Sequence, residues 1–120
     1  MYRKFTGYLF ILFLISIVLI SCSRPVLNNQ IRFGIQAAHK GLWDEAIFRW
    51  KKVIDSNPGS AAAHNNLAVA YENKGLLEEA KKEYEIALKL SPRNNYIKSN
   101  FENFKKVYEP QENEKKDKKY

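Results

Sequence analysis

The chain has 120 residues, of which 28% are charged and 13% aromatic, a composition that suits one small folded domain with short appendages. Its formal net charge is +7, but the charged residues are spread along the chain, and no base-reading motif accompanies them, which argues against a nucleic-acid-binding protein. The single cysteine excludes a disulfide within the chain.

Residues 1–21 have the pattern of a targeting segment. Arg3 and Lys4 form a short basic region, and an apolar run follows from Tyr8 to Ile20. The run ends in Leu19-Ile20-Ser21-Cys22, which resembles the bacterial lipobox. The resemblance implies that Cys22 receives a diacylglyceryl group on its thiol and becomes the first residue of the mature protein, whose net charge would fall from +7 to +5.

Residues 22–26 are then the lipidated cysteine and a short linker, with a reach of about 14 Å at most. Ser23 follows the cysteine where lipoproteins of the inner membrane of enteric bacteria often carry Asp. This resemblance favours the outer membrane of a bacterial cell envelope. The alternative is an uncleaved membrane anchor, because the charge-free run from Phe5 to Ser23 would be roughly 28 Å long as a helix.

Residues 61–94 predict two helices joined at Gly75. Apolar residues recur at helical spacing on either side of this glycine. Ser60 can cap the first helix, Gly75 can take the left-handed conformation that closes it, and Pro92 can end the second. The two apolar stripes consist of Ala63, Leu67, Ala70 and Tyr71, and of Leu77, Ala80, Tyr84, Ala87 and Leu88.

The same pattern occurs 34 residues upstream, which divides the chain into repeats over residues 27–60 and 61–94. Small residues, at Gly34 and Ala46 in the first repeat, recur in the second and would let the helices approach closely. Bulky Trp50 and its counterpart would fill the space beside them. The matched pairs are Phe33 and Leu67, Gly34 and Ala68, Ala37 and Tyr71, Gly41 and Gly75, Trp43 and Leu77, Ala46 and Ala80, Trp50 and Tyr84, Val53 and Ala87, and Pro58 and Pro92.

This pattern resembles the tetratricopeptide repeat (TPR), which has a 34-residue period. The second copy carries it as Leu67-Ala68-x2-Tyr71, then Ala80-x3-Tyr84, then Pro92. The resemblance implies an all-α fold, a short TPR-type α-solenoid of two helix-turn-helix repeats. We expect Phe33, like Leu67, to face its partner helix.

Residues 95–109 predict a fifth helix that caps the open end of the array. Its apolar stripe consists of Ile97, Phe101, Phe104 and Tyr108. We expect Pro110 to end this helix and residues 110–120 to form a disordered polar tail.

The leading helix of the first repeat is apolar on a second face, which lines the concave groove in TPR proteins. A groove that begins apolar and becomes polar along the array predicts a bound peptide or helix with one apolar anchor. The alternative is that Ile31 and Ile35 pack under residues 25–27 or against a second copy of the chain. The predicted groove residues are Ile31, Ile35, Ala38, His39, Asn65, Val69, Glu72 and Asn73.

The sequence does not predict an enzyme, a cofactor site or a metal site. His39 and His64 stand on different helices and lack a second ligand at i+4. His39 could contact a partner at the groove edge, whereas His64 is expected to pack. Trp43 and Trp50 fall at repeat-defining positions, so we expect both in the core.

TPR domains are binding modules, and the fold does not name the partner. We therefore expect a lipid-anchored adaptor in a bacterial envelope assembly, such as a secretin or pilus system, outer-membrane protein assembly or a cell-wall enzyme complex. The familiar TPR groove for acidic C-terminal peptides is disfavoured, because Ile31 and Ile35 replace its polar residues and only Asn66 fits. Two alternatives are a membrane-surface homodimer formed through the two isoleucines, and binding of anionic lipid head groups or polymers.

Overall fold

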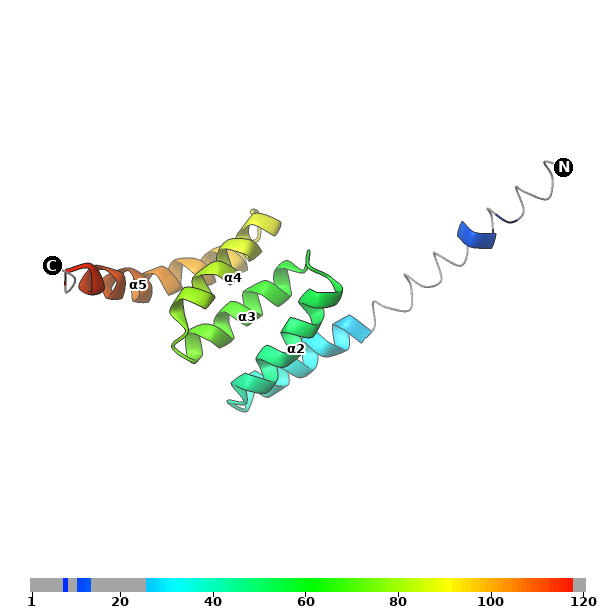
Figure 1. Cartoon of the computed structure of the whole chain (residues 1–120), viewed down its shortest axis with the longest axis horizontal. Helices are drawn as coiled ribbons and strands as arrows, with labels where there is room; N and C mark the ends of the chain where they lie inside the picture. Colours follow the sequence, from blue (N-terminus) through cyan, green and yellow to red (C-terminus); the bar gives the residue numbers. More distant parts are fainter. Residues whose placement is uncertain (1–7, 9–10, 14–25, 118–120) are drawn as a thin grey trace.

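The computed structural model describes residues 8, 11–13 and 26–117, and the side chains of the last range as far as Pro110. Most of the predicted leader and linker, including Cys22, lies outside the described residues. The helix over residues 26–39 comes first. It is followed by α2 (Trp43–Ser56), α3 (Ala61–Asn73), α4 (Leu77–Leu90) and α5 (Asn95–Asp117) (Figure 1).

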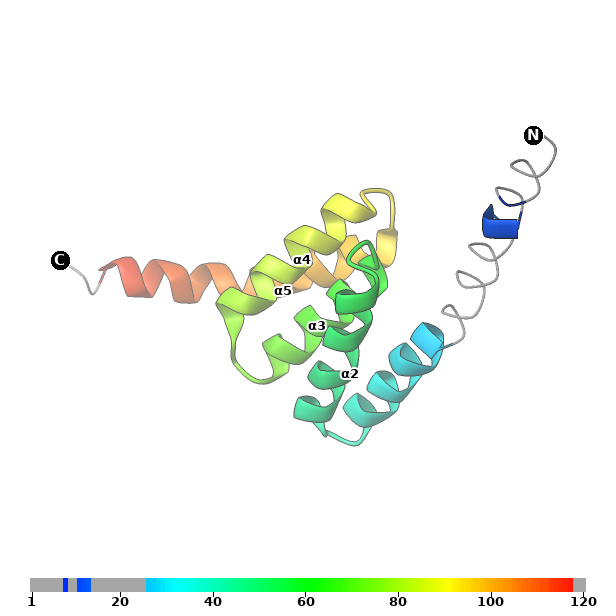
Figure 2. The same cartoon turned by 45° about the vertical axis from the view of Figure 1, so that its right-hand side comes forward.

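The helices form successive antiparallel hairpins, as a TPR-type fold requires. α3 packs against α2 on one side and α4 on the other, and α4 packs against α5 (Figure 2). α5 also contacts α3, so it occupies the place of the leading helix of a third repeat. The described chain is an all-α array of two helix-turn-helix repeats and a capping helix, which confirms the predicted fold class.

Equivalent turns join the two helices of each repeat. Gly41 and Gly75 both have φ of 73°, the left-handed conformation that favours glycine. In both turns the residue after the glycine donates its backbone N–H to a carbonyl five residues earlier, at 2.9 Å. Ser60 accepts a hydrogen bond from the Ala63 N–H at 3.3 Å, so the predicted cap of α3 is confirmed.

The core depends on small residues at the helix contacts. Ala46, Ala68 and Ala80 are fully buried, and the aromatic rings of Trp50 and Tyr84 fill the adjoining space. At Gly34 a β-carbon would lie 2.7 Å from Cε2 of Trp50, closer than packed atoms approach. The predicted close helix contacts are therefore confirmed.

Phe33 is not packed in the core between the helices, so the prediction that it matches Leu67 is wrong; its contact with α2 is with the Arg49 guanidinium at the surface. The Phe33 side chain is 44% exposed, whereas the matching Leu67 is 2% exposed. Leu67 packs into a cluster with Ala46 and Trp50 of the preceding repeat. Phe33 belongs to the first repeat, and no preceding repeat covers it among the described residues.

α5 closes the other end of the array. Phe104 is fully buried, with its ring centroid 5.2 Å from that of Tyr84 and 5.3 Å from that of Tyr108. Ile97 is also buried, and Phe101 is half-buried beside the same cluster. The predicted cap over the last apolar stripe is confirmed.

The prediction that Pro110 ends this helix is wrong, because α5 continues through it to Asp117. Proline removes one backbone donor but can be accommodated inside a helix with a local bend. The sequence after Pro110 is rich in Glu and Lys, which have high helix propensity. This propensity favours continuation of the helix beyond Pro110.

Candidate functional site

A cavity of about 220 Å³ opens among the leading helices of the array. Three of its residues come from the helix over residues 26–39, two from α2, two from α3 and one from α5. We call it the aromatic groove. It is lined by Ile35, Ala38, His39, Trp43, Trp50, Asn66, Val69 and Tyr96.

The structure brings four of the eight predicted groove residues together. Ile35, Ala38, His39 and Val69 all line the aromatic groove. Ile31 is half-buried one turn before Ile35, and its backbone carbonyl accepts a hydrogen bond from the Trp50 indole at 3.3 Å. This bond fixes the indole in the wall of the groove.

Asn65 lies inside the array, although the sequence placed it in the groove. It is 1% exposed, and its side-chain oxygen accepts a hydrogen bond from Asn100 at 3.1 Å. Because Asn100 belongs to α5, the capping helix covers this position. The amide therefore joins α3 to α5.

Glu72 and Asn73 also make contacts within the repeat. The Tyr84 hydroxyl donates a hydrogen bond to the Glu72 carboxylate at 2.9 Å. Burial, followed by this hydrogen bond and the negative charge of Glu72, raises the pKa of Tyr84 well above its usual range, so the hydroxyl stays protonated and donates. Asn73 is exposed and donates to the backbone carbonyl of Val69 at 2.8 Å.

Four lining residues were not among the predicted groove residues: Trp43, Trp50, Asn66 and Tyr96. Asn66 was noted only as the residue that fits the TPR groove for acidic C-terminal peptides. The two tryptophans were expected in the core; Trp50 is buried there, at 2% exposure, and one edge still reaches the groove. Tyr96 is 66% exposed near the start of α5. The 34-residue spacing does not point to it, because its counterparts at that spacing, Ala62 and Asn28, do not line the groove.

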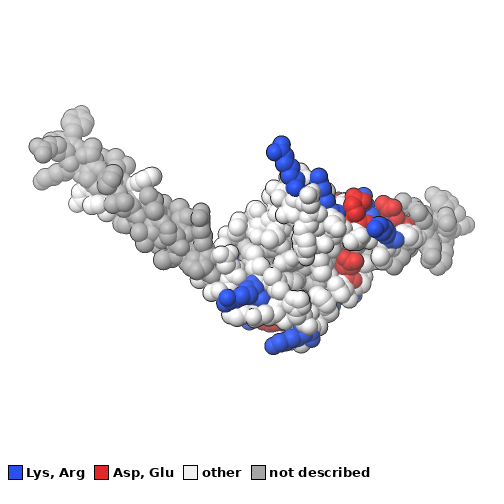
Figure 3. All heavy atoms as spheres, turned by 180° about the vertical axis from the view of Figure 1, so that it is seen from behind, with Lys and Arg blue, Asp and Glu red and all other residues white. Residues whose placement is uncertain are grey.

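The lining of the groove is mainly apolar and aromatic. It contains neither Lys or Arg nor Asp or Glu, and its polar side chains include Asn66 and His39. α2 and α4 lie in front in Figure 1, so the view from behind in Figure 3 shows the side of the leading helices. Much of this face is uncharged, with basic side chains near its edges and acidic ones toward the α5 end. Such a surface can hold an apolar side chain and hydrogen-bond the backbone beside it.

His64 has a structural role in the second repeat. It is 6% exposed, and its Nδ1 lies 2.6 Å from the Glu83 carboxylate while its Nε2 lies 3.0 Å from the Pro58 carbonyl oxygen. Both ring nitrogens are thus engaged by protein atoms. No group of three or more His, Cys, Asp or Glu side chains that could hold a metal ion occurs among the described residues.

Comparison with known families matches residues 32–118, more than half of the chain, to a domain of unknown function, DUF6340. The chain belongs to the DUF6340 family. The DUF6340 match takes in residues 32–60 of the first repeat, the whole second repeat, all of α5 and every residue that lines the aromatic groove.

A 41-residue part of this DUF6340 chain is 54% identical to the mouse (Mus musculus) protein O-mannosyl-transferase TMTC4. That match covers 34% of the chain but only 6% of the mouse protein.

Two solved structures are also similar. One is the first TPR of Spaghetti (RPAP3) bound to the HSP90 peptide SRMEEVD, with 22% identity, a TM-score of 0.40, and coverage of 68% of this chain and 91% of that chain. The other is the first TPR domain of human RPAP3, with 22% identity, a TM-score of 0.39, and coverage of 72% and 95%.

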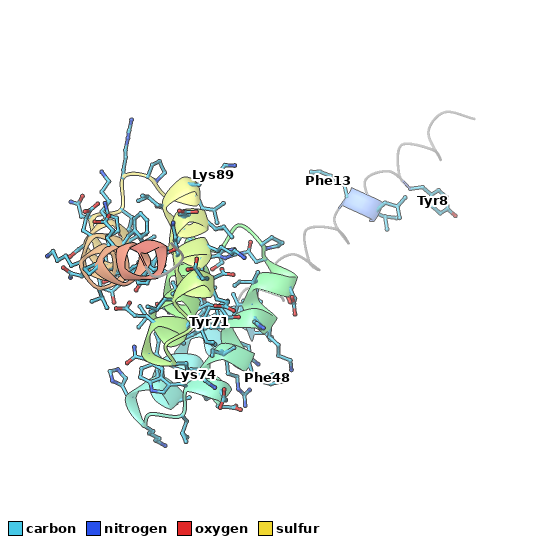
Figure 4. The ribbon with its side chains drawn as sticks, turned by 60° about the vertical axis from the view of Figure 1, so that its left-hand side comes forward. Tyr8, Phe13, Phe48, Tyr71, Lys74 and Lys89 are labelled. Atoms are coloured by element: carbon cyan, nitrogen blue, oxygen red, sulfur yellow. The ribbon has the colours of Figure 1, made fainter. Side chains whose placement is uncertain are left out.

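The apolar N-terminal segment is only partly described. Tyr8, Ile11, Leu12 and Phe13 are all more than half exposed, and Figure 4 shows Tyr8 and Phe13 well away from the repeats. Among the helices that the structure describes, none has both the length and the apolar composition needed to span a membrane.

Proposed function

We propose that this DUF6340 protein is a lipid-anchored adaptor that docks a protein partner through its aromatic groove in a bacterial envelope assembly. The observation that carries the proposal is the groove itself, an uncharged cavity to which the first helix, α2, α3 and α5 all contribute. A TPR-type array provides such a concave surface for peptides and helices.

The lining specifies the chemistry of the partner. The cavity, at about 220 Å³, is smaller than the roughly 300–1,000 Å³ of typical small-molecule pockets. It suits one large apolar side chain from a peptide or helix. An acidic anchor is disfavoured, because no Lys or Arg in the lining would pair with a carboxylate.

The membrane setting rests on the lipobox-like sequence ending at Cys22. An acylated Cys22, with each buried methylene contributing about 0.8 kcal/mol, would hold the adaptor on a membrane, and two or more chains would hold it stably. We propose the periplasmic face of the outer membrane, in a secretin or pilus system, an outer-membrane assembly complex or a cell-wall enzyme complex. Mass spectrometry of the mature N-terminus tests this part. A Cys22→Ser chain that is still cleaved and membrane-bound like the wild type would contradict it.

The groove is tested by crosslinking in cells from a photoreactive residue at His39. The double variant Ile35→Ser/Tyr96→Ala should keep the helical signal and melting temperature but lose the crosslinked partner, because both side chains are exposed in the groove. The matched control is Ile86→Ser/Leu90→Ala on α4, since Ile86 has the same 39% exposure as Ile35. Equal loss of crosslinking in both variants would show that the groove is not the docking site.

A second candidate is a homodimer formed through Ile31 and Ile35. It is favoured by the exposure of Ile35, a large apolar side chain at the edge of the groove. Light scattering would then give twice the chain mass, and the crosslinked product would be a second copy of the chain. Ile31→Ser/Ile35→Ser should return the protein to a monomer.

A further inference from the structure

The first repeat carries a second surface that the groove does not explain. Phe33 and Phe48 are exposed at 44% and 51%, and cations lie over both rings. The Arg32 guanidinium is 5.8 Å from the Phe33 centroid, that of Arg49 is 5.9 Å from each ring centroid, and the Lys52 Nζ is 5.0 Å from that of Phe48. We call these five residues the cationic aromatic face.

Helix packing leaves this face uncovered. At the position of Phe33, the second repeat has Leu67, which is covered by the preceding repeat, and α5 has Phe101, which is half-buried against Tyr84. Of these three equivalent residues, only Phe33 is exposed. Phe48 lies beside it on α2, and Figure 4 shows its side chain at the surface of the array.

Two residues of the face, Arg32 and Phe33, lie on the helix that directly follows the proposed membrane tether, and the other three lie on α2. Val26, at the start of the helix, is 58% exposed and stands seven residues before Phe33. Residues at i and i+7 share one side of a helix, about 10 Å apart along its axis. Val26 and Phe33 therefore share one side of this helix, with the polar side chains of Asn29 and Gln30 between them.

The charges of the face are mixed, with cations in excess. Glu45 pairs with Arg49 at 2.6 Å, and Asp55 lies near Lys52 at the border of a neighbouring cavity. Arg32 contacts the side-chain oxygen of Asn29, an uncharged partner. Arg32 and Lys52 can therefore reach anions outside the protein.

We propose that the cationic aromatic face rests on an anionic lipid surface, with Phe33 and Phe48 at the level of the head groups and Arg32 and Lys52 on lipid phosphates. The inference rests on the membrane tether of the proposed function, which holds this face within a short linker of the bilayer. Exposed aromatic rings bordered by Lys and Arg are the side chains that interfacial contacts use. The contact would orient the array on the membrane and leave the aromatic groove free.

The test uses residues 23–120, because all the buried core residues described lie between Gly34 and Tyr108. Flotation with vesicles of phosphatidylcholine alone is compared with flotation in which about a third of the lipid is phosphatidylglycerol. Binding should require the anionic lipid and weaken as salt is raised. Each basic side chain near such a surface strengthens binding by about fivefold, so Arg32→Gln/Lys52→Gln should weaken it by about 25-fold.

Phe33→Ser/Phe48→Ser should weaken binding by more than about tenfold, since the interfacial contact scales with the apolar area inserted. The matched controls are Lys89→Gln/Arg93→Gln for charge and Ile86→Ser/Leu90→Ser for apolar area, all at exposed positions away from the face. Circular dichroism checks that each variant folds. If the phenylalanine variant unfolds, the charge variant still decides the matter.

Equal flotation with both kinds of vesicle, or equal loss in the control variants, would overturn the proposal. So would a dimer in solution that only the phenylalanine variant dissociates, because the face would then join two copies. These outcomes are independent of Cys22, since the tested chain lacks its lipid. A failed lipid anchor would instead be seen in the mass of the full-length protein.

Discussion

In each repeat, a polar contact between side chains at equivalent positions joins the two helices. The burial of this contact differs between the two repeats. In the first repeat Arg49 donates to Gln30 at 3.2 Å, and in the second the Glu83 carboxylate lies 2.6 Å from His64; the partners are 19 positions apart in the sequence in both cases. His64 is buried at 6%, whereas Gln30 and Arg49 are partly exposed. The burial of each pair depends on how many helices pack against its repeat.

The large aromatic residues of the two repeats also stand at equivalent positions and make different polar contacts. Trp50 donates to the Ile31 backbone carbonyl, and Tyr84 donates to the Glu72 carboxylate. Both rings fill the space beside small residues, and each finds a polar partner for its donor. The same position of the repeat thus accepts two chemically different aromatic side chains, Trp50 and Tyr84.

The largest expected effect on stability is at this aromatic position in the second repeat. Tyr84→Ala should lower the free energy of unfolding by about 3 to 5 kcal/mol, because it removes a ring that packs on α5 as well as on its own repeat. Tyr84→Phe keeps the ring and should cost only about 1 kcal/mol from the lost hydrogen bond to Glu72. Denaturant titration measures both. Similar losses in the two variants would mean that the hydroxyl, not the ring, is the main contribution.

The next effect tests the closest helix contact of the first repeat. Gly34→Ala should destabilise the protein by about 3 kcal/mol, at the upper end of the overpacking range, because the new methyl group meets the buried Trp50 ring. Gly59→Ala is the control, since its new methyl group would lie an ordinary 3.6 Å from the side-chain oxygen of Asn57. Its thermal midpoint should stay near that of the wild type. A Gly34→Ala protein that melts like this control would contradict the packing described.

The smallest effect compares the two polar pairs directly. His64→Ala should cost about 1.5 kcal/mol, because it deprives the partly buried Glu83 carboxylate of its charge-assisted contact. Gln30→Ala should cost less than about 0.5 kcal/mol, because water can solvate the partly exposed Arg49. Urea titrations of the two single variants measure the difference. Equal losses would show that the neighbouring helices do not determine the contribution of the pair.

The repeat spacing was enough to predict the helical hairpins, because each one is built from local signals. Ser60 caps α3, Gly41 and Gly75 close the turns, and small residues at the contacts set the helix approach. These signals depend only on residues within one or two turns. The cap was also predictable, since its apolar stripe matches the side of α4 that it covers.

The wrong predictions mainly concern which neighbouring helix a side chain packs against. Periodicity placed Phe33 on the same stripe as Leu67 but could not show that, among the described residues, no helix ahead of the first repeat packs against Phe33. Asn65 was assigned to the groove because the position of α5 across α3 follows from the superhelical path, not from a local pattern. Tyr96 was missed for the same reason. The prediction that Pro110 ends the helix was wrong because it rested on the proline alone and not on the helix propensity of the sequence after it.

The covered and uncovered ends of the array limit the symmetry of any assembly built through them. Open filaments require two different complementary surfaces on each copy, so that every added copy presents a new one. α5 occupies the surface on which a further repeat would stack, and of the two ends of the described array only the Phe33 side remains uncovered. Where that side contacts the same side of a second copy, a twofold axis relates the two copies. Growth through these ends then stops at two copies.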